Sequence, residues 1–220
     1  MFPRVVTALA VFAAGAASAA AQVPGAPTLQ NAFANPGLAF AADFGSGAGS
    51  SFFGAAGAWG LGSGKIQVSG VAGAERSQTT TRGAYGARAA MSLWSSSGGS
   101  LGAGVFAGIG GGPRSRDSLG VIRNPARMNV PVGVSLGYRR PFGSSRGVSA
   151  YASPMYRWSR VDAGTGGITS TGAFRVAAGV DFAVSQSFGV TGGAELGGAD
   201  AASNSSAVFG FAVTFVPGRR

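Results

Sequence analysis

The chain has 220 residues, of which 40 are Gly and only 11% are charged, and it contains no Cys and no His. So much Gly disfavours a helical domain, because each Gly inside a helix costs about 1 kcal/mol relative to Ala. The missing Cys excludes disulfides, thiolate metal ligands and lipid attachment at an N-terminal Cys, and the missing His removes the commonest general base. We therefore expect no enzyme, no cofactor and no metal site.

The N-terminal residues have the pattern of an export signal. Arg4 precedes an apolar stretch at 5–14, and small residues that offer Ala-x-Ala cleavage sites follow it. This pattern predicts a secretory signal peptide over residues 1–21. The alternative is an uncleaved membrane anchor, but the apolar stretch is shorter than the roughly 20 residues that a membrane-spanning helix needs. Residues 22–37, which contain three prolines, predict an extended leader.

From residue 38 onward the sequence alternates with period two, which predicts strands rather than helices. The clearest case is residues 174–184, where Phe174 and Val176 lie on an apolar face while Arg175 and Asp181 lie on the other. Such alternation predicts ten strands, most of them of the length that a tilted strand needs to cross a bilayer, about 9 to 11 residues. The predicted strands are 38–45, 52–61, 65–75, 83–94, 101–110, 129–139, 148–159, 173–184, 188–198 and 207–216.

The connections alternate in length. Those predicted on one side are 62–64, 95–100, 140–147 and 185–187, and those predicted on the other are 46–51, 76–82, 111–128, 160–172 and 200–206. The longer connections gather in the second set. Bacterial outer-membrane barrels have an even number of strands, short periplasmic turns and longer extracellular loops. We therefore predict an all-β protein whose residues 38–216 form a transmembrane antiparallel up-and-down β-barrel of about ten strands, with eight or twelve as alternatives, followed by a C-terminal tail at 217–220.

In such a barrel the apolar face meets lipid and the polar face lines the lumen. The sequence favours this arrangement over a soluble sandwich, because the polar face is rich in Gly, Ala and Ser and the chain contains one Lys. Four acidic and four basic residues then point inward, which predicts ion pairs inside a narrow or plugged lumen. We expect Arg175 to pair with Glu195 and Glu75 to pair with Arg88; solvation of some of these charges at the rims is the alternative. The eight lumen candidates are Asp43, Glu75, Arg88, Arg139, Arg157, Arg175, Asp181 and Glu195.

The last predicted strand sets Phe209, Phe211 and Phe215 on one face. With the signal peptide and the ten-strand pattern, this resembles the small outer-membrane β-barrel proteins of Gram-negative bacteria, of the OmpA, OmpX and OmpW-like kind. The resemblance implies that these aromatic residues form the signal read by the outer-membrane assembly machinery, after escort by periplasmic chaperones. It also implies an outer-membrane location, contact with lipid and lipopolysaccharide, and a structural or surface-interaction role. The chain departs from the pattern in the residues that follow Phe215. We expect a monomer.

The formal net charge is +10, and the longer connections carry seven Arg against three Asp. Arginine forks suit phosphate groups, so we expect Arg114, Arg116, Arg123 and Arg127 to contact lipopolysaccharide or another anionic surface ligand; a solvated loop without a specific partner is the alternative. Nucleic acid is disfavoured as a partner, because these residues have no recognition helix or aromatic platform beside them. Two other functions remain open, a small porin or hydrophobic-solute channel and a secreted soluble β-sandwich or adhesin.

Overall fold

A computed structural model describes residues 37–47, 50–61, 65–77, 80–116, 119–142, 146–199 and 207–217. The predicted signal peptide, almost all of the predicted leader and the last three residues of the predicted tail lie outside these ranges. The described residues are almost entirely β-strand, and the one helical segment is the short 3-10 turn η1 (Gly164–Gly166). None of the described residues belongs to a helix that is both long enough and apolar enough to cross a membrane.

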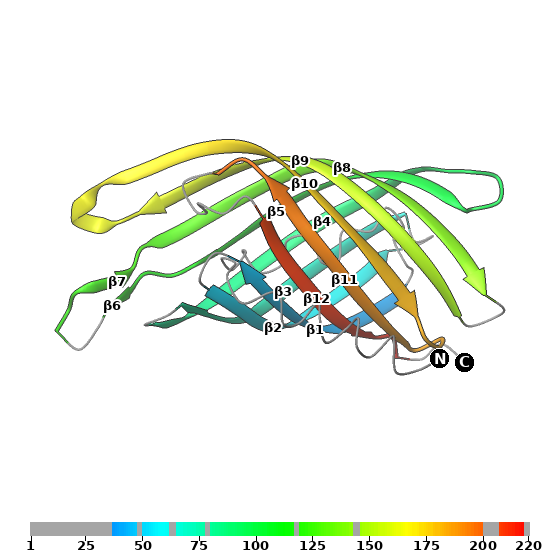
Figure 1. The fold of residues 1–220 in the computed structure, drawn as a ribbon, viewed down its shortest axis with the longest axis horizontal. Helices are drawn as coiled ribbons and strands as arrows, with labels where there is room; N and C mark the ends of the chain where they lie inside the picture. Colours follow the sequence, from blue (N-terminus) through cyan, green and yellow to red (C-terminus); the bar gives the residue numbers. More distant parts are fainter. Residues whose placement is uncertain are drawn as a thin grey trace.

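Ten strands form a closed antiparallel barrel, which confirms the predicted all-β antiparallel barrel and its strand number (Figure 1). Each strand pairs with its neighbours in the chain, and β1 pairs with β12 to close the sheet. The barrel strands are β1 (Gly37–Gly47), β2 (Ser50–Leu61), β3 (Ile66–Ser77), β4 (Thr81–Ser95), β5 (Leu101–Gly112), β8 (Ala126–Phe142), β9 (Arg146–Asp162), β10 (Ile168–Ala183), β11 (Phe188–Gly197) and β12 (Ala207–Phe215).

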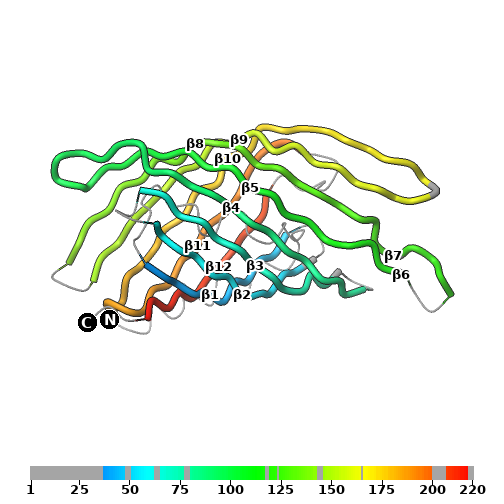
Figure 2. Tube along the Cα trace, turned by 180° about the vertical axis from the view of Figure 1, so that it is seen from behind, coloured from blue at the N-terminus to red at the C-terminus, as the bar shows by residue number. Residues whose placement is uncertain are grey.

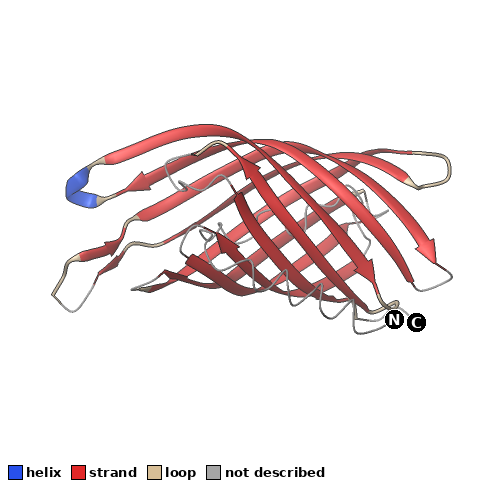
Figure 3. Cartoon of the chain, viewed as in Figure 1, coloured by secondary structure: helices blue, strands red, loops and turns tan. Residues whose placement is uncertain are grey.

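The two ends of the barrel differ. At one end, here called the hairpin end, β9 and β10 extend beyond their neighbours, and the small β6–β7 hairpin (Ser115–Arg116 and Ile122–Asn124) projects beside them (Figures 1 and 2). η1 lies at the tip of the β9–β10 extension (Figure 3). At the other end, here called the turn end, connections of three to five residues join β2 to β3, β4 to β5, β8 to β9 and β10 to β11. The connections from β1 to β2 and from β3 to β4, at the hairpin end, are shorter than the sequence predicts.

The structure departs from the sequence prediction at the hairpin end. The sequence predicts an unbroken loop over 111–128, whereas β5 continues to Gly112 and β8 begins at Ala126. Between them the β6–β7 hairpin is held by Asn124, whose side-chain amide donates hydrogen bonds to the hydroxyls of Thr80 and Ser115, each at 2.8 Å. Strand pairing therefore continues after the alternation of apolar residues has ended.

Side chains alternate between the outer surface and the lumen along every barrel strand. On β10, Phe174 is 79% exposed on the outer surface, whereas its neighbour Arg175 is 1% exposed inside. Val176 and Phe182 are also exposed, and Ala177 is fully buried. The apolar face is thus the outer face, as the sequence pattern predicts for a barrel and not for a sandwich.

Glycines inside the barrel make room for large side chains. The ring of Phe52 lies across Gly54 and Gly73, where an added Cβ would come within 2.4 Å and 2.6 Å of ring atoms. The Tyr151 hydroxyl lies over Gly179 in the same way, at 2.5 Å from the position of an added Cβ. The high Gly content therefore has a packing role, because it lets a small number of aromatic side chains fill the lumen.

A single methyl group tests this packing. We predict that Gly73→Ala lowers the free energy of unfolding by about 1–3 kcal/mol, because the new Cβ would meet both the Phe52 ring and strand β2. The matched control is Gly70→Ala on the same strand, where the nearest atom to an added Cβ is 3.8 Å away. Urea unfolding of both variants in detergent micelles measures the difference, and equal stability of the two would contradict the packing role.

Candidate functional site

The lumen near the hairpin end holds a buried group of charges around Glu195, here called the Glu195 cluster. Arg157 Nη1 lies 2.8 Å from Glu195 Oε1, and Arg175 Nε donates to the same oxygen. All three side chains are at most 3% exposed. Each of these side chains points into the lumen because side chains alternate along a strand. Strands β10 and β11 pair so that Glu195 lies opposite Ala177, and Arg175 is therefore the diagonal neighbour of Glu195. Arg157 reaches Glu195 from β9, on the far side of β10.

A second cluster, here called the Glu75 cluster, forms around Glu75 on β3. Glu75 Oε2 accepts from Arg82, whose Nη2 is 2.7 Å away, and from Arg127. Arg82 also donates to the carbonyl oxygen of Pro125 at 3.0 Å. Strands β3 and β4 pair so that Glu75 faces Arg82 directly, while Arg127 arrives from β8.

The predicted pair between Glu75 and Arg88 is wrong. The register of β3 with β4 sets Arg88 opposite Ser69, six positions away from Glu75. Arg88 is buried instead over the ring of Phe106, with its guanidinium carbon 5.4 Å from the ring centroid, which is a cation–π contact. The middle of the lumen is therefore filled by an arginine and an aromatic ring.

The other lumen candidates lie in three different settings. Asp43 is buried on β1, and its Oδ1 atom has no hydrogen-bond partner among the described residues. Asp181 accepts from the hydroxyls of Ser149 at 3.0 Å and Thr191 at 2.7 Å. Arg139 is exposed at the turn end and donates to the carbonyl oxygen of Gly99 at 2.7 Å, so it does not lie in the buried interior. Arg139 also lines the cavity at the turn end.

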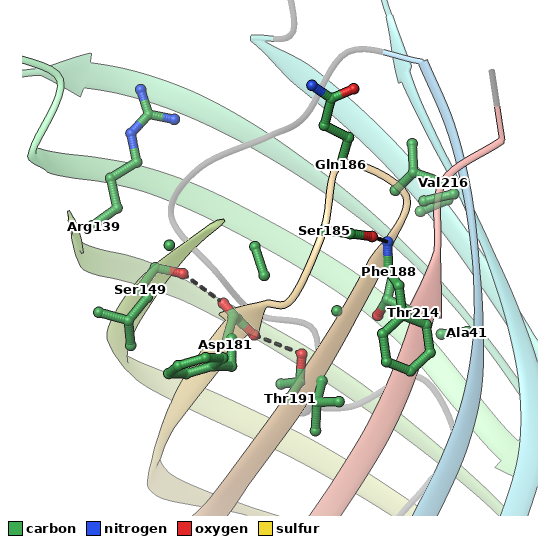
Figure 4. A pocket seen from close by; sticks show the side chains of 18 of the residues that line it. Ala41, Arg139, Ser149, Asp181, Ser185, Gln186, Phe188, Thr191, Thr214 and Val216 are labelled. Atoms are coloured by element: carbon green, nitrogen blue, oxygen red, sulfur yellow. Dashed lines mark hydrogen bonds between the residues drawn. The ribbon is translucent and has the colours of Figure 1, made fainter. Parts of the chain in front are cut away.

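The turn end of the lumen contains a cavity of about 660 Å³. Asp181 and its two hydroxyl partners line it, together with Gln67, Ser69 and the small residues of β1 and β2. Figure 4 shows Asp181 between Ser149 and Thr191, with Arg139 at some distance from them. The lumen is therefore hollow at the turn end and filled with buried charges toward the hairpin end.

The predicted anion-contact residues separate into different roles. Arg127 is a buried partner of Glu75, so the prediction that it faces outward is wrong; β8 begins one residue earlier and turns its side chain into the lumen. Arg114 pairs with Asp162 at 2.6 Å. Arg116 is exposed and donates to the carbonyl oxygen of Gly120 at 2.9 Å. The side chain of Arg123 lies outside the described residues.

The three predicted assembly-signal residues follow one face of β12. Phe209 and Phe215 are exposed on the outer surface, and Phe211, which is half-buried, lies between them. Phe215 faces Phe40 on β1 and Phe188 on β11. The apolar outer surface therefore continues across the junction of β1 with β12. A role of these residues in assembly stays a prediction.

Sequence reasoning missed three lumen residues, Arg82, Arg127 and Asn129. Asn129 is 1% exposed on β8, and its Oδ1 accepts from Ser159 Oγ at 2.5 Å. Arg82 could have been found by counting outward from the β3–β4 turn, because a tight hairpin pairs residues at equal distances from its centre. No group of three or more metal-ligating side chains occurs in the part of the chain that the structure describes.

No family model matches the chain, and the comparison with curated proteins finds no match either. The function is therefore inferred from the residues and their geometry.

The Glu195 cluster is tested by a double-mutant cycle. We predict that Arg175→Ala lowers the free energy of unfolding by about 3 kcal/mol, because it leaves a buried carboxylate with one arginine in place of two. Adding Glu195→Gln should recover part of this loss, so that the double variant is about 1–3 kcal/mol more stable than additive effects require. Urea unfolding gives all three values. The control is the exposed Arg116→Ala, for which we expect a change within about 0.5 kcal/mol. Strictly additive losses at positions 175 and 195 would contradict the pairing.

Proposed function

We propose that this chain is an integral outer-membrane β-barrel protein whose lumen is closed by buried charges and which has a structural or surface-interaction role. One observation carries the proposal, the outward apolar face of a closed barrel. Phe174 is 79% exposed beside the buried Arg175, and the same inversion recurs on neighbouring strands. Exposed apolar surface that continues around a molecule marks a lipid or protein contact, because soluble monomers rarely expose large apolar patches.

The height of the apolar surface fits a bilayer. Phe174 and Phe182 lie at the two ends of the continuous apolar run on the outer face of β10, about 26 Å apart along the strand at roughly 3.3 Å per residue. A tilt of about 40° reduces this to about 20 Å along the barrel axis, close to the roughly 25 Å apolar band of outer-membrane barrels. Exposed aromatic residues mark both ends of this surface, as interfacial girdles do. They include Trp59, Trp94 and Tyr138 toward the turn end and Phe53, Tyr85 and Tyr156 toward the hairpin end.

Closure supports the same conclusion. A barrel whose first and last strands pair leaves no sheet edge, and hydrocarbon tolerates only backbones whose polar groups are satisfied internally. The two longest connections, between β5 and β8 and between β11 and β12, lie at the hairpin end and match extracellular loops. The connections of three to five residues at the turn end match periplasmic turns. In this orientation the exposed Arg116 and the side chain of Arg160 face the phosphorylated outer leaflet. We also propose that periplasmic chaperones escort the chain and that the outer-membrane assembly machinery inserts it as a monomer. The proposed role includes no catalysis.

The filled lumen favours a structural or surface role over the porin alternative. Ion-selective pores carry rings of one charge sign around an open path. Here both signs meet in buried pairs, with Glu195 between two arginines and Glu75 between two others. None of these six residues lines the cavity at the turn end.

Heating separates a membrane barrel from the soluble alternative. We predict that the chain isolated from outer-membrane fractions migrates faster in electrophoresis when unboiled than when boiled, because a barrel resists detergent at room temperature. It should also stay with the membrane after a urea wash. Unchanged migration together with release into the soluble fraction would support a secreted sandwich or adhesin.

Planar bilayers test the closed lumen. We predict that the purified chain produces no stable single-channel steps, because ions would have to displace two clusters of buried charges. The comparison variant is Glu195→Gln with Arg157→Gln and Arg175→Gln, which keeps hydrogen-bonding side chains but removes the charges; we expect conductance steps to appear or to become more frequent. Steady conductance of the unmodified chain would support the porin alternative.

A further inference from the structure

Positive charge gathers at the turn end of the barrel. The connections at this end, 62–65, 96–100, 143–145 and 184–187, contain no Asp or Glu. Basic residues lie in or beside two of them, namely Lys65, Arg139, Arg140 and Arg146. An anionic partner that approaches this end therefore meets basic side chains and no carboxylate from these connections.

Two of the basic residues, Arg140 and Arg146, share the outer face of the hairpin that joins β8 to β9 (Figure 1). Strand pairing sets Arg146 opposite Phe142 and Arg140 opposite Val148, so the two arginines are diagonal neighbours on one face. Diagonal neighbours across an antiparallel pair stand about 7–8 Å apart. Two long side chains at this separation can reach one phosphate group between them.

The two arginines stand where the apolar outer surface ends. Val148, the partner of Arg140, pairs on its other side with Phe182, which ends the apolar run on β10. The guanidinium carbon of Arg140 lies 5.9 Å from the centroid of the exposed Phe142 ring, a cation–π contact. An arginine whose apolar stem lies along an apolar surface and whose charged head reaches its edge is typical of a membrane interface.

Neither Arg140 nor Arg146 forms an ion pair with a carboxylate among the residues that the structure describes, and both are exposed. Asp181 on β10 faces the lumen, where it accepts hydrogen bonds from Ser149 and Thr191. Both arginines also stand at the rim of the turn-end cavity. Guanidinium groups donate paired hydrogen bonds to phosphate oxygens with good geometry. The complement of this surface is therefore a phosphate group attached to an apolar tail.

We propose that Arg140 and Arg146 bind the phosphate of one anionic phospholipid, with phosphatidylglycerol as the simplest case. Both guanidinium groups donate hydrogen bonds to the phosphate oxygens, and the acyl chains lie along the outer face beside Val148 and Phe182. This site rests on the proposed membrane location and lies in the periplasmic leaflet of the proposed orientation. It differs from a contact with lipopolysaccharide, because it lies at the other end of the barrel.

Lipid retention in native mass spectrometry tests the site. The mature chain is released from detergent micelles that contain equal concentrations of phosphatidylglycerol or of zwitterionic phosphatidylcholine. We expect one phosphatidylglycerol to stay bound at concentrations at which phosphatidylcholine is lost, because the choline group cancels the phosphate charge. Equal retention of the two lipids would overturn the proposal, and this comparison needs no variant. Glycerol 3-phosphate separates a lipid from a soluble anion: retention equal to that of phosphatidylglycerol would also overturn it.

Two substitutions locate the contact. We expect Arg140→Gln and Arg146→Gln each to weaken phosphatidylglycerol binding about fivefold, and the double variant to weaken it about thirtyfold. The matched control is Arg139→Gln, which removes the same charge one position away but on the lumen face, and which should change binding by less than about twofold because distant charges are screened. An equal loss in the control, or no loss in the double variant, contradicts the site.

Electrophoresis of the same samples separates this proposal from the proposed function. Migration that changes on boiling, together with no preference for phosphatidylglycerol, would refute the lipid site and leave the membrane barrel standing. Migration unchanged by boiling would refute the barrel, and the lipid site with it.

Discussion

The pairing of β1 with β12 is the interaction on which the rest of the structure depends. It joins the two ends of the sheet from Phe40 and Phe215 to Ser46 and Phe209. Without it the sheet would expose two edges, and its backbone donors and acceptors would lack partners there. Closure also converts a period-two pattern into an outside and an inside, because successive side chains of a strand point to opposite faces. The apolar outer surface and the charged lumen are therefore two consequences of the same pairing.

Alternation and turn chemistry were enough to predict the ten barrel strands from the sequence, because both are local properties. The inward direction of Arg175 and Glu195 followed from the same alternation, and the structure places them together. The Glu75 partner was predicted incorrectly, because register depends on the centre of the β3–β4 turn and an apolar pattern alone does not fix it. Arg127 was beyond prediction for another reason: it reaches Glu75 across the lumen, between strands that are not neighbours. Contacts across a closed barrel depend on its diameter and stagger, which no short stretch of sequence encodes.

The unusual composition follows from the need to fill a small cylinder. A lumen of this kind has little room, so most inward positions carry Gly, Ala or Ser, and a few large side chains lie across them. Phe52 over Gly73 and Tyr151 over Gly179 show the arrangement. The sequence indicated small inward residues but not which large residues lie against them, because that choice depends on the register of neighbouring strands.

The lumen is hollow at the turn end and filled with buried charges toward the hairpin end. The stability of the barrel and the filling of its lumen therefore depend on the same side chains. A solute that enters the cavity at the turn end passes Asp181 and meets Arg88 lying against Phe106. Beyond them it meets two carboxylates that are each held by two arginines. To open a path, these pairs must separate in a region with little water, where breaking one buried pair costs about 3–5 kcal/mol. If the lumen is closed as we propose, the contacts that brace the strands against one another are also the contacts that obstruct the path. A change that opens the lumen by removing these charges should also weaken the barrel, because the same side chains perform both tasks.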